Sequence, residues 1–244
     1  MTPRLNELWV YLSASPLLGL SITLLAYQMA YWIFRRSGMH PLANPVLIAV
    51  TALVALLMAT GTSYQTYFDG AQFVHFLLGP ATVALAVPLY AQLKRVRTML
   101  LPVLSGLLAG SLTAALSAMA VGKLFGASVP TLLSLAPKSV TTPIAMGVAE
   151  RIGGIPSLTA VLVIATGILG AVSARTVFDA MHLKDPAIRG FAIGVASHGI
   201  GTARAFQVSE QAGAFAALAM GLNGLLTALL LPSILPWLGD WLAK

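Results

Sequence analysis

The chain has 244 residues, of which 58% are hydrophobic and 9% charged, and its mean hydropathy is +0.88. Soluble domains are about 45–50% apolar, so the composition predicts instead one polytopic, all-α membrane domain over residues 1–244. The net charge of +7 lies in short loops beside apolar runs, which is typical of membrane proteins and leads us to expect no nucleic acid partner. The absence of cysteine excludes disulfides, thiolate metal sites and cysteine nucleophiles.

Apolar segments long enough to cross a bilayer, about 17–25 residues each, recur along the whole chain. The first is too long for the apolar region of a cleaved signal peptide, about 7–15 residues, so we expect a retained span. Two segments, at 130–152 and 190–205, carry Pro or Gly and are predicted to be broken or re-entrant helices. The prediction is about eight segments, which run over residues 8–34, 45–59, 71–93, 99–121, 130–152, 157–178, 190–205 and 211–231.

The basic residues predict the sidedness of these segments. If every segment crosses once, residues 35–36, the run 94–97 and Arg151 fall on one side, while Lys123 and the mixed-charge hinge 179–190 fall on the other. The positive-inside rule predicts that the first side is cytoplasmic. Both termini are then expected outside.

A weak internal similarity relates "LLGPATVALAVPLYAQLKR" at 77–95 to "SLAPKSVTTPIAMGVAERI" at 134–152. Transporters are often built from repeats that carry broken helices at corresponding positions, so the similarity is consistent with an internal repeat. Small-residue spans also resemble one another through composition alone, and the sequence does not separate these interpretations.

The first interruption is "APKSVTTPIAMGVAE" at 136–150. Pro137 and Pro143 lack an N–H and disfavour helix in the residue before them, so the stretch between them is predicted to be unwound. Thr142 and Pro143 form a cap and first-turn pair that starts a new half-helix, whose positive end faces the break. The substrate-binding residues predicted here form an anion receptor of one cation and three hydroxyls: Lys138, Ser139, Thr141 and Thr142.

Two other interpretations of the charges in this segment stay open. Lys138 costs roughly 2.5–3.5 kcal/mol at the centre of a membrane helix, unless it snorkels to the interface or pairs with Glu150. Glu150 and Arg151 form either a structural ion pair or a gate at the mouth of a cavity.

The second interruption is "ASHGIGTARAF" at 196–206. Gly199 and Gly201 supply backbone that can bend sharply or approach a ligand, and Thr202 can cap the helix that follows. His198 offers a hydrogen bond or carries a proton, and Arg204 can bind a carboxylate with two hydrogen bonds. The alternative for His198 is a structural role, as a core residue whose hydrogen bonds are all made within the protein.

Two further polar residues are weaker candidates for the lining of the same cavity. His75 lies one turn before Gly79-Pro80. Asn223 in "MGLNGLL" serves as commonly as a hydrogen-bonding contact between helices. No residues are predicted to hold a metal or a cofactor.

The stretches "LAPKSVTTPIAMGVAERIGGIPSLTA" at 135–160 and "GFAIGVASHGIGTARAFQVSEQAGAFAALAMGLNGL" at 190–225 resemble the LrgB/CidB family of bacterial inner-membrane proteins, over essentially the whole chain. The resemblance implies a multi-pass protein of that membrane that works with a small LrgA/CidA-type membrane partner. A plastid relative fuses both parts and exchanges glycolate and glycerate. Bacterial pairs are linked to pyruvate transport and to holin/antiholin control of murein hydrolases.

Two functions therefore compete. The first is an alternating-access secondary transporter of small monocarboxylates of the pyruvate, glycolate and glycerate class, in which Lys138 and Arg204 hold the carboxylate. The alternative is a holin/antiholin-like regulator of murein hydrolase export and lysis, which needs no substrate site. An enzyme is not expected, because Ser197 and His198 are adjacent rather than convergent and no HExxH motif is present. Small-residue faces permit a homo-oligomer or a heteromer equally.

Overall fold

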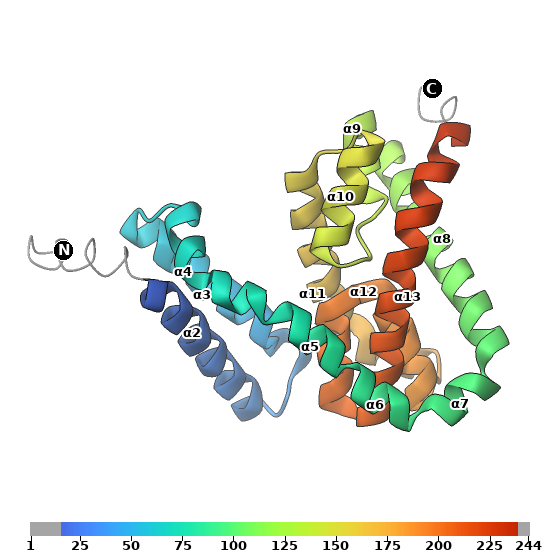
Figure 1. The fold of residues 1–244 in the computed structure, drawn as a ribbon, viewed down its shortest axis with the longest axis horizontal. Helices are drawn as coiled ribbons and strands as arrows, with labels where there is room; N and C mark the ends of the chain where they lie inside the picture. The colour runs from blue at the N-terminus through green and yellow to red at the C-terminus, as the bar shows by residue number, and fades with distance from the viewer. Residues whose placement is uncertain (1–15, 239–244) are drawn as a thin grey trace, which may run out of the picture. The chain divides into compact units, whose positions relative to one another are not determined.

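The computed structural model describes residues 16–238, and all regular structure in that range is helical (Figure 1). The chain forms two compact units, the first ending at Ala84 and the second starting at Leu85. Each unit is described by itself. The single domain over 1–244 stays a prediction.

The first unit contains the helices before Ala84. Asn44 caps α3 by accepting hydrogen bonds from the backbone N–H groups of Val46 and Leu47 at 2.9 and 3.1 Å, which confirms the start predicted at Asn44-Pro45. α2 packs on both α3 and α4, and the Thr23 and Tyr67 hydroxyls lie 2.7 Å apart. Positions 8–15 of the first predicted segment lie outside the described residues. The helices are α2 (Pro16–Arg36), η1 (Pro41–Ala43), α3 (Pro45–Thr60), α4 (Tyr64–Phe76) and α5 (Leu78–Ala84).

The second unit contains four long helices, one of which is broken in its middle, and several short ones. Its helices are α6 (Ala86–Ala91), α7 (Leu93–Thr98), α8 (Leu100–Leu124), α9 (Val129–Leu135), α10 (Thr142–Ile152), α11 (Pro156–Ala180), α12 (Pro186–Val208), α13 (Glu210–Ile234) and η2 (Leu235–Leu238).

Within residues 16–238, four helices are long and apolar enough to cross a membrane: α2, α8, α11 and α13. A bent pair, Tyr64–Val74 with Gly79–Ala91, would make a fifth span if it crosses as one. The protein is thus an all-helical membrane protein, but eight crossings are not confirmed. The shortfall arises because several predicted segments are folded as short or interrupted helices.

The segment at 130–152 has the re-entrant form, one of the two predicted for it, and does not make the single crossing assumed for the sidedness. The Ser134 hydroxyl, near the end of α9, accepts a hydrogen bond from the Ile155 N–H at the start of α11 at 2.8 Å. The chain that follows α9 therefore leaves this level through the unwound stretch at 136–141 and returns to it through α10. We call α9, residues 136–141 and α10 hairpin A.

α12 is also folded back on itself. Ser197 and His198 have non-helical backbone angles, and a Cβ at Gly201 would lie 2.8 Å from the carbonyl oxygen of Ile193. In a continuous helix residues 193 and 201 would be about 12 Å apart along the axis. Near the start of α13, Ala212 packs against Gly190, so the chain has returned to its starting level. We call the two limbs of α12 hairpin B.

The hairpins enter the second unit from opposite ends. α13 runs from Ala212, which lies beside Gly190 of hairpin B, to Leu231, which packs with Leu133 and Val148 of hairpin A. We call these the α7 end and the α9 end, and Figure 1 shows them at the bottom and the top of this unit. The second unit therefore pairs a long helix with a hairpin twice, α8 with hairpin A and α11 with hairpin B, in opposite directions.

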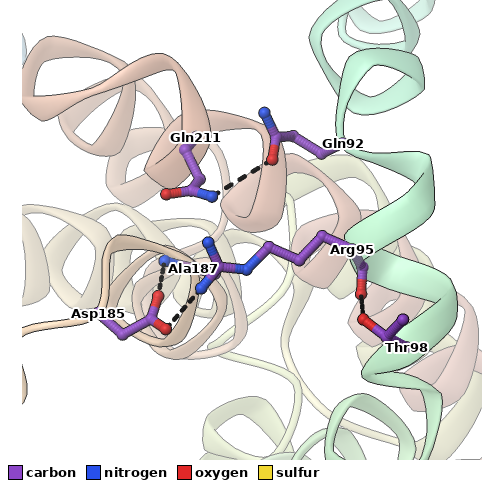
Figure 2. A network of polar contacts seen from close by, with 6 residues as sticks. All are labelled: Gln92, Arg95, Thr98, Asp185, Ala187 and Gln211. Carbon is purple, nitrogen blue, oxygen red and sulfur yellow. Dashed lines mark hydrogen bonds and ion pairs between the residues drawn. The ribbon is translucent and has the colours of Figure 1, made fainter.

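A hydrogen-bond network corrects the predicted sidedness (Figure 2). The Arg95 guanidinium lies 2.6 Å from the Asp185 carboxylate, and Gln211 donates to Gln92 at 3.3 Å. The hinge at 179–190 therefore lies at the same end as the basic run 94–97. Arg151 lies at the opposite end, with Lys123, because hairpin A does not cross.

The repeat proposed at an offset of 57 residues is not confirmed. Residues 78–98 form three consecutive short helices, whereas 134–152 contains the end of α9, an unwound stretch and α10. The shared Gly-Pro and Ala-Pro pairs thus occupy different local structures.

Candidate functional site

The tips of hairpins A and B meet at one side chain of α13. Asn223 Nδ2 donates to the carbonyl oxygen of Ser139 at 3.3 Å, in the unwound stretch of hairpin A. The same nitrogen donates to the carbonyl oxygen of Val195 at 3.0 Å, just before the break in hairpin B. An amide nitrogen has two hydrogens, so one buried side chain joins both breaks. The two interrupted segments of the sequence therefore meet at Asn223.

Lys138 lies at this junction. Its Nζ donates to the Ser139 hydroxyl at 3.3 Å, and its side chain is partly buried. Lys138 also interacts electrostatically with His198 on the tip of hairpin B. Within the described residues Lys138 makes no ion pair with Glu150. A half-buried cation at the meeting of two hairpins has the position expected of an anion-binding group.

His198 forms the tip of hairpin B in a strained conformation. Its φ of 42° and ψ of −134° lie in a region that favours glycine. Its ring Nε2 lies 2.9 Å from the carbonyl oxygen of Val163 on α11, and its side chain is 4% exposed. The imidazole is therefore buried and hydrogen-bonded. This fits both interpretations from the sequence, a satisfied core residue and a group that binds a ligand or carries a proton.

Two glycines of α11 make room for this tip, and the sequence analysis missed them. A Cβ at Gly170 would lie 1.7 Å from the Ser197 hydroxyl oxygen, and a Cβ at Gly167 would lie 2.7 Å from His198 Nε2. Hairpin B thus rests directly on the backbone of α11. The signal was available as two glycines three residues apart in an apolar span, the kind of small-residue face that permits close packing in membranes.

The half-helix predicted after the first break is present, with its cap displaced by one residue. α10 begins at Thr142, and Thr141 is the N-cap, with an extended backbone and a carbonyl that accepts from the Ala145 N–H. Neither the Thr141 hydroxyl nor any other cap side chain bonds to the first turn. The first amides of a helix carry partial positive charge, so this end of α10 presents positive potential to the tips.

Two buried polar atoms at the tips have no hydrogen-bond partner among the described residues: the Ser197 hydroxyl oxygen and Asn223 Oδ1. Both side chains are 1% exposed. An unpaired polar group in such a place costs about 1–3 kcal/mol. Groups of this kind are retained where a ligand or water completes them, which supports a binding role for the junction.

The second break begins earlier than predicted. The non-helical residues are Ser197 and His198, whereas Gly199 and Gly201 lie in the returning limb. Gly201 is required because its Cβ would meet Ser197 Cβ at 2.6 Å, whereas a Cβ at Gly199 would meet only Met220, at 3.8 Å. Thr202 is buried and its hydroxyl donates to the carbonyl oxygen of His198 at 2.8 Å, which stabilises the turn.

Arg204 lies apart from Lys138. It follows His198 by six residues in the returning limb, about 9 Å along the helix axis, and it lines a cavity with Arg175, Lys184 and Arg189 at the α7 end. Its Nη1 donates to Gln207 Oε1 at 3.1 Å. The structure therefore does not bring both predicted carboxylate-binding cations to one place.

The predicted charges at the end of α10 do not belong to the junction. Glu150 and Arg151 occupy the exposed last turn of α10, and neither forms an ion pair within residues 16–238. His75 lies on α4 of the first unit, and its side chain is outside what the structure describes. Its predicted role in the cavity stays a prediction, as does the gate.

Among the described residues no group of three or more His, Asp or Glu side chains could hold a metal ion. The polar groups that converge at the junction are a lysine, hydroxyls, an amide, an imidazole and backbone groups around the start of α10. This set can bind a small anion by charge and hydrogen bonds.

The fold and the site define a polytopic helical membrane protein in which two opposed hairpins meet at a polar junction. A family model described as the LrgB-like family matches residues 23–237. The chain belongs to this family, as the resemblance predicted.

The chain is similar to curated relatives along almost its full length. It is 28% identical over 225 residues to an "Antiholin-like protein LrgB" of Bacillus cereus (strain B4264), which covers 92% of this chain and 98% of the relative. The protein of the same name from Bacillus anthracis (strain CDC 684 / NRRL 3495) gives the same identity and coverage. No solved structure matches the chain.

Proposed function

We propose that the protein carries small monocarboxylates across the bacterial cytoplasmic membrane, with the carboxylate bound where hairpins A and B meet. The observation that carries this proposal is the position of Asn223, which joins both tips beside Lys138. Unwound backbone at membrane depth is tolerated where it is buried in protein or lines a cavity. Discontinuous helices with opposed orientations are the usual form of substrate sites in secondary transporters.

Lys138 supplies the charge for this site, and the Ser139, Thr141 and Thr142 hydroxyls supply hydrogen bonds to the carboxylate or to an α-hydroxyl group. Alternating access then requires one hairpin to separate from the other while the long helices stay in place. His198 is the group best suited to couple transport to protons, because it is the imidazole at the tip of hairpin B and interacts electrostatically with Lys138.

The second candidate is an antiholin-like regulator of murein hydrolase export, and the names of the relatives favour it. These names support the regulator better than they support transport. The regulator alone gives no account of a half-buried lysine beside unpaired polar atoms at two helix breaks. An LrgA/CidA-type partner, a homo-oligomer or both fit either function.

Sidedness follows from the basic residues of the second unit. Those at the α7 end outnumber those at the α9 end, where Lys123 and Arg151 lie. The positive-inside rule therefore assigns the α7 end to the cytoplasm. The residues at the α7 end are Lys94, Arg95, Arg97, Arg175, Lys184, Arg189 and Arg204.

The test is uptake of radiolabelled pyruvate and glycolate into proteoliposomes, with and without an LrgA-like partner. Saturable uptake should be lost in Lys138→Ala, partly retained in Lys138→Arg, and unchanged in Lys94→Ala, a control that removes an exposed lysine of α7. Absence of uptake in the wild type, with the partner and a proton gradient present, would favour the regulator. Equal uptake by wild type and Lys138→Ala would show that the carboxylate does not bind at the junction.

A further inference from the structure

A second cavity, separate from the junction, lies at the α7 end between α11 and the two limbs of hairpin B. Its volume is about 290 Å³, and four cationic side chains line it: Arg175, Lys184, Arg189 and Arg204. No acidic residue lines it. The nearby carboxylate of Asp179 pairs with Arg189 and lies 3.8 Å from Arg175, on the rim.

One of the four cations is held rigidly. Arg189 donates to the carbonyl oxygen of Leu183 and to Asp179, and its guanidinium lies over the Phe178 ring, 5.8 Å from the ring centroid. Arg175 and Lys184 are exposed at the edge, and within the described residues Lys184 forms no ion pair. The cavity therefore combines one ordered cation with two that can move onto a ligand.

The rest of the wall is apolar and includes Phe178, Ile193 and Val208. A cavity that only attracted a dissolved anion would not need such walls. Apolar walls below a ring of cations suit a molecule that has an anionic head and a hydrocarbon body, and basic pockets between membrane helices on the cytoplasmic side bind lipid head groups.

The size of the cavity agrees with this chemistry. A cavity needs about 10–15 Å³ to hold one water molecule, so this cavity has room for a group of many atoms. This is enough space for a glycerol phosphate group. Because the limbs of hairpin B form two of its walls, a bound head group would hold these limbs together.

We infer that this cavity binds the head group of an anionic phospholipid from the cytoplasmic leaflet, with the phosphate at Arg175, Lys184, Arg189 and Arg204 and the first acyl carbons against Phe178, Ile193 and Val208. The inference does not depend on the transported substrate.

The test measures binding of phosphatidylglycerol and phosphatidylcholine to the full-length protein in detergent, by native mass spectrometry and by the shift in Tm. Phosphatidylglycerol should bind and raise Tm, and phosphatidylcholine should do so much less. The variant Arg175→Gln/Lys184→Gln should bind phosphatidylglycerol about tenfold more weakly or worse. The matched control, Arg97→Gln, removes an exposed charge at the same end but outside the cavity and should bind like the wild type.

Three outcomes would overturn the inference. Equal loss in Arg97→Gln and in the double variant would indicate unspecific attraction to the basic end. Equal stabilisation by inorganic phosphate or pyruvate at matched concentration would assign the cavity to dissolved anions. Equal binding of both lipids by the wild type would show that the cavity does not recognise the anionic head group. Both substituted side chains of the double variant are exposed, so its Tm without lipid should stay near that of the wild type.

Discussion

Asn223 on α13 donates a hydrogen bond to the carbonyl oxygen of Ser139, a residue 84 positions earlier in the chain and at the tip of the opposite hairpin. Its second hydrogen reaches Val195 in hairpin B. One side chain therefore fixes the distance between two breaks that sequence alone shows only as separate motifs. The stability and the activity of the junction should both depend on it.

Replacement of Asn223 by Leu should destabilise the protein by about 1–3 kcal/mol, because two buried carbonyl oxygens lose their donor. Measurements in membrane proteins give values towards the lower end of this range. The free energy of unfolding can be measured by denaturant titration in detergent micelles. Ser233→Ala, an exposed position on the same helix, should change it little. Equal stability of Asn223→Leu and the wild type would show that the junction is not held by this amide.

Gly170→Ala should disrupt the packing of hairpin B on α11, because the added Cβ would lie 1.7 Å from the Ser197 hydroxyl oxygen. Overpacking typically costs about 1–3 kcal/mol, which should lower Tm and the yield of monodisperse protein. Adding Ser197→Ala should recover part of the loss, because the nearest remaining atom is then Ser197 Cβ at 2.9 Å. Gly221→Ala has no atom within 4 Å of the new Cβ and should be tolerated. If Gly170→Ala behaved like Gly221→Ala, the close approach would be refuted.

The backbone conformation of His198 predicts which of two substitutions at this position gives the more stable protein. His198→Ala loses the contact with Val163 and keeps a β-carbon at a φ of 42°, whereas His198→Gly loses the same contact but relieves the strain. His198→Gly should therefore be the more stable of the two, by about 1 kcal/mol, in thermal unfolding of the purified variants. Neither should support proton-coupled uptake if His198 carries the proton. A lower Tm for His198→Gly than for His198→Ala would contradict the strained turn.

The absence of native cysteine makes the corrected sidedness directly testable by single-cysteine labelling. A membrane-impermeant maleimide added to intact spheroplasts should label Leu124→Cys and Arg151→Cys. It should label Arg97→Cys and Lys184→Cys only after permeabilisation. Labelling of Arg151→Cys together with Arg97→Cys would restore the single crossing predicted for residues 130–152 and refute hairpin A.

The positions of the breaks were predictable from the sequence because proline and glycine act locally. Pro137 and Pro143 end one helix and start the next within a residue of the predicted boundaries. Helices α8, α11 and α13 were predictable from the lengths of their apolar runs. The function of each break as the tip of a hairpin was not predictable in this way.

The direction of the chain after a break depends on contacts that hydropathy does not encode. Whether residues 142–152 continue across the membrane or turn back is decided by pairs such as Ser134 with Ile155. This caused the error in the predicted sidedness, because each hairpin that is counted as a crossing reverses the side of the membrane assigned to every later segment. Arg204 was grouped with Lys138 because both are cations near a break, although in the folded protein Arg204 lines the cavity at the α7 end.

The two hairpins also determine the order in which the molecule can be assembled. α9 has 7 residues and α10 has 11, so neither can span a bilayer of about 30 Å alone, and the stretch between them carries Lys138 and has no helical structure. Hairpin A therefore needs partners before it can leave the membrane surface. The carbonyl oxygen of Ser139 accepts its hydrogen bond from Asn223 of α13, which is synthesised 84 residues later. The long helices must enter the membrane first, and the binding junction is completed only when the last of them has arrived.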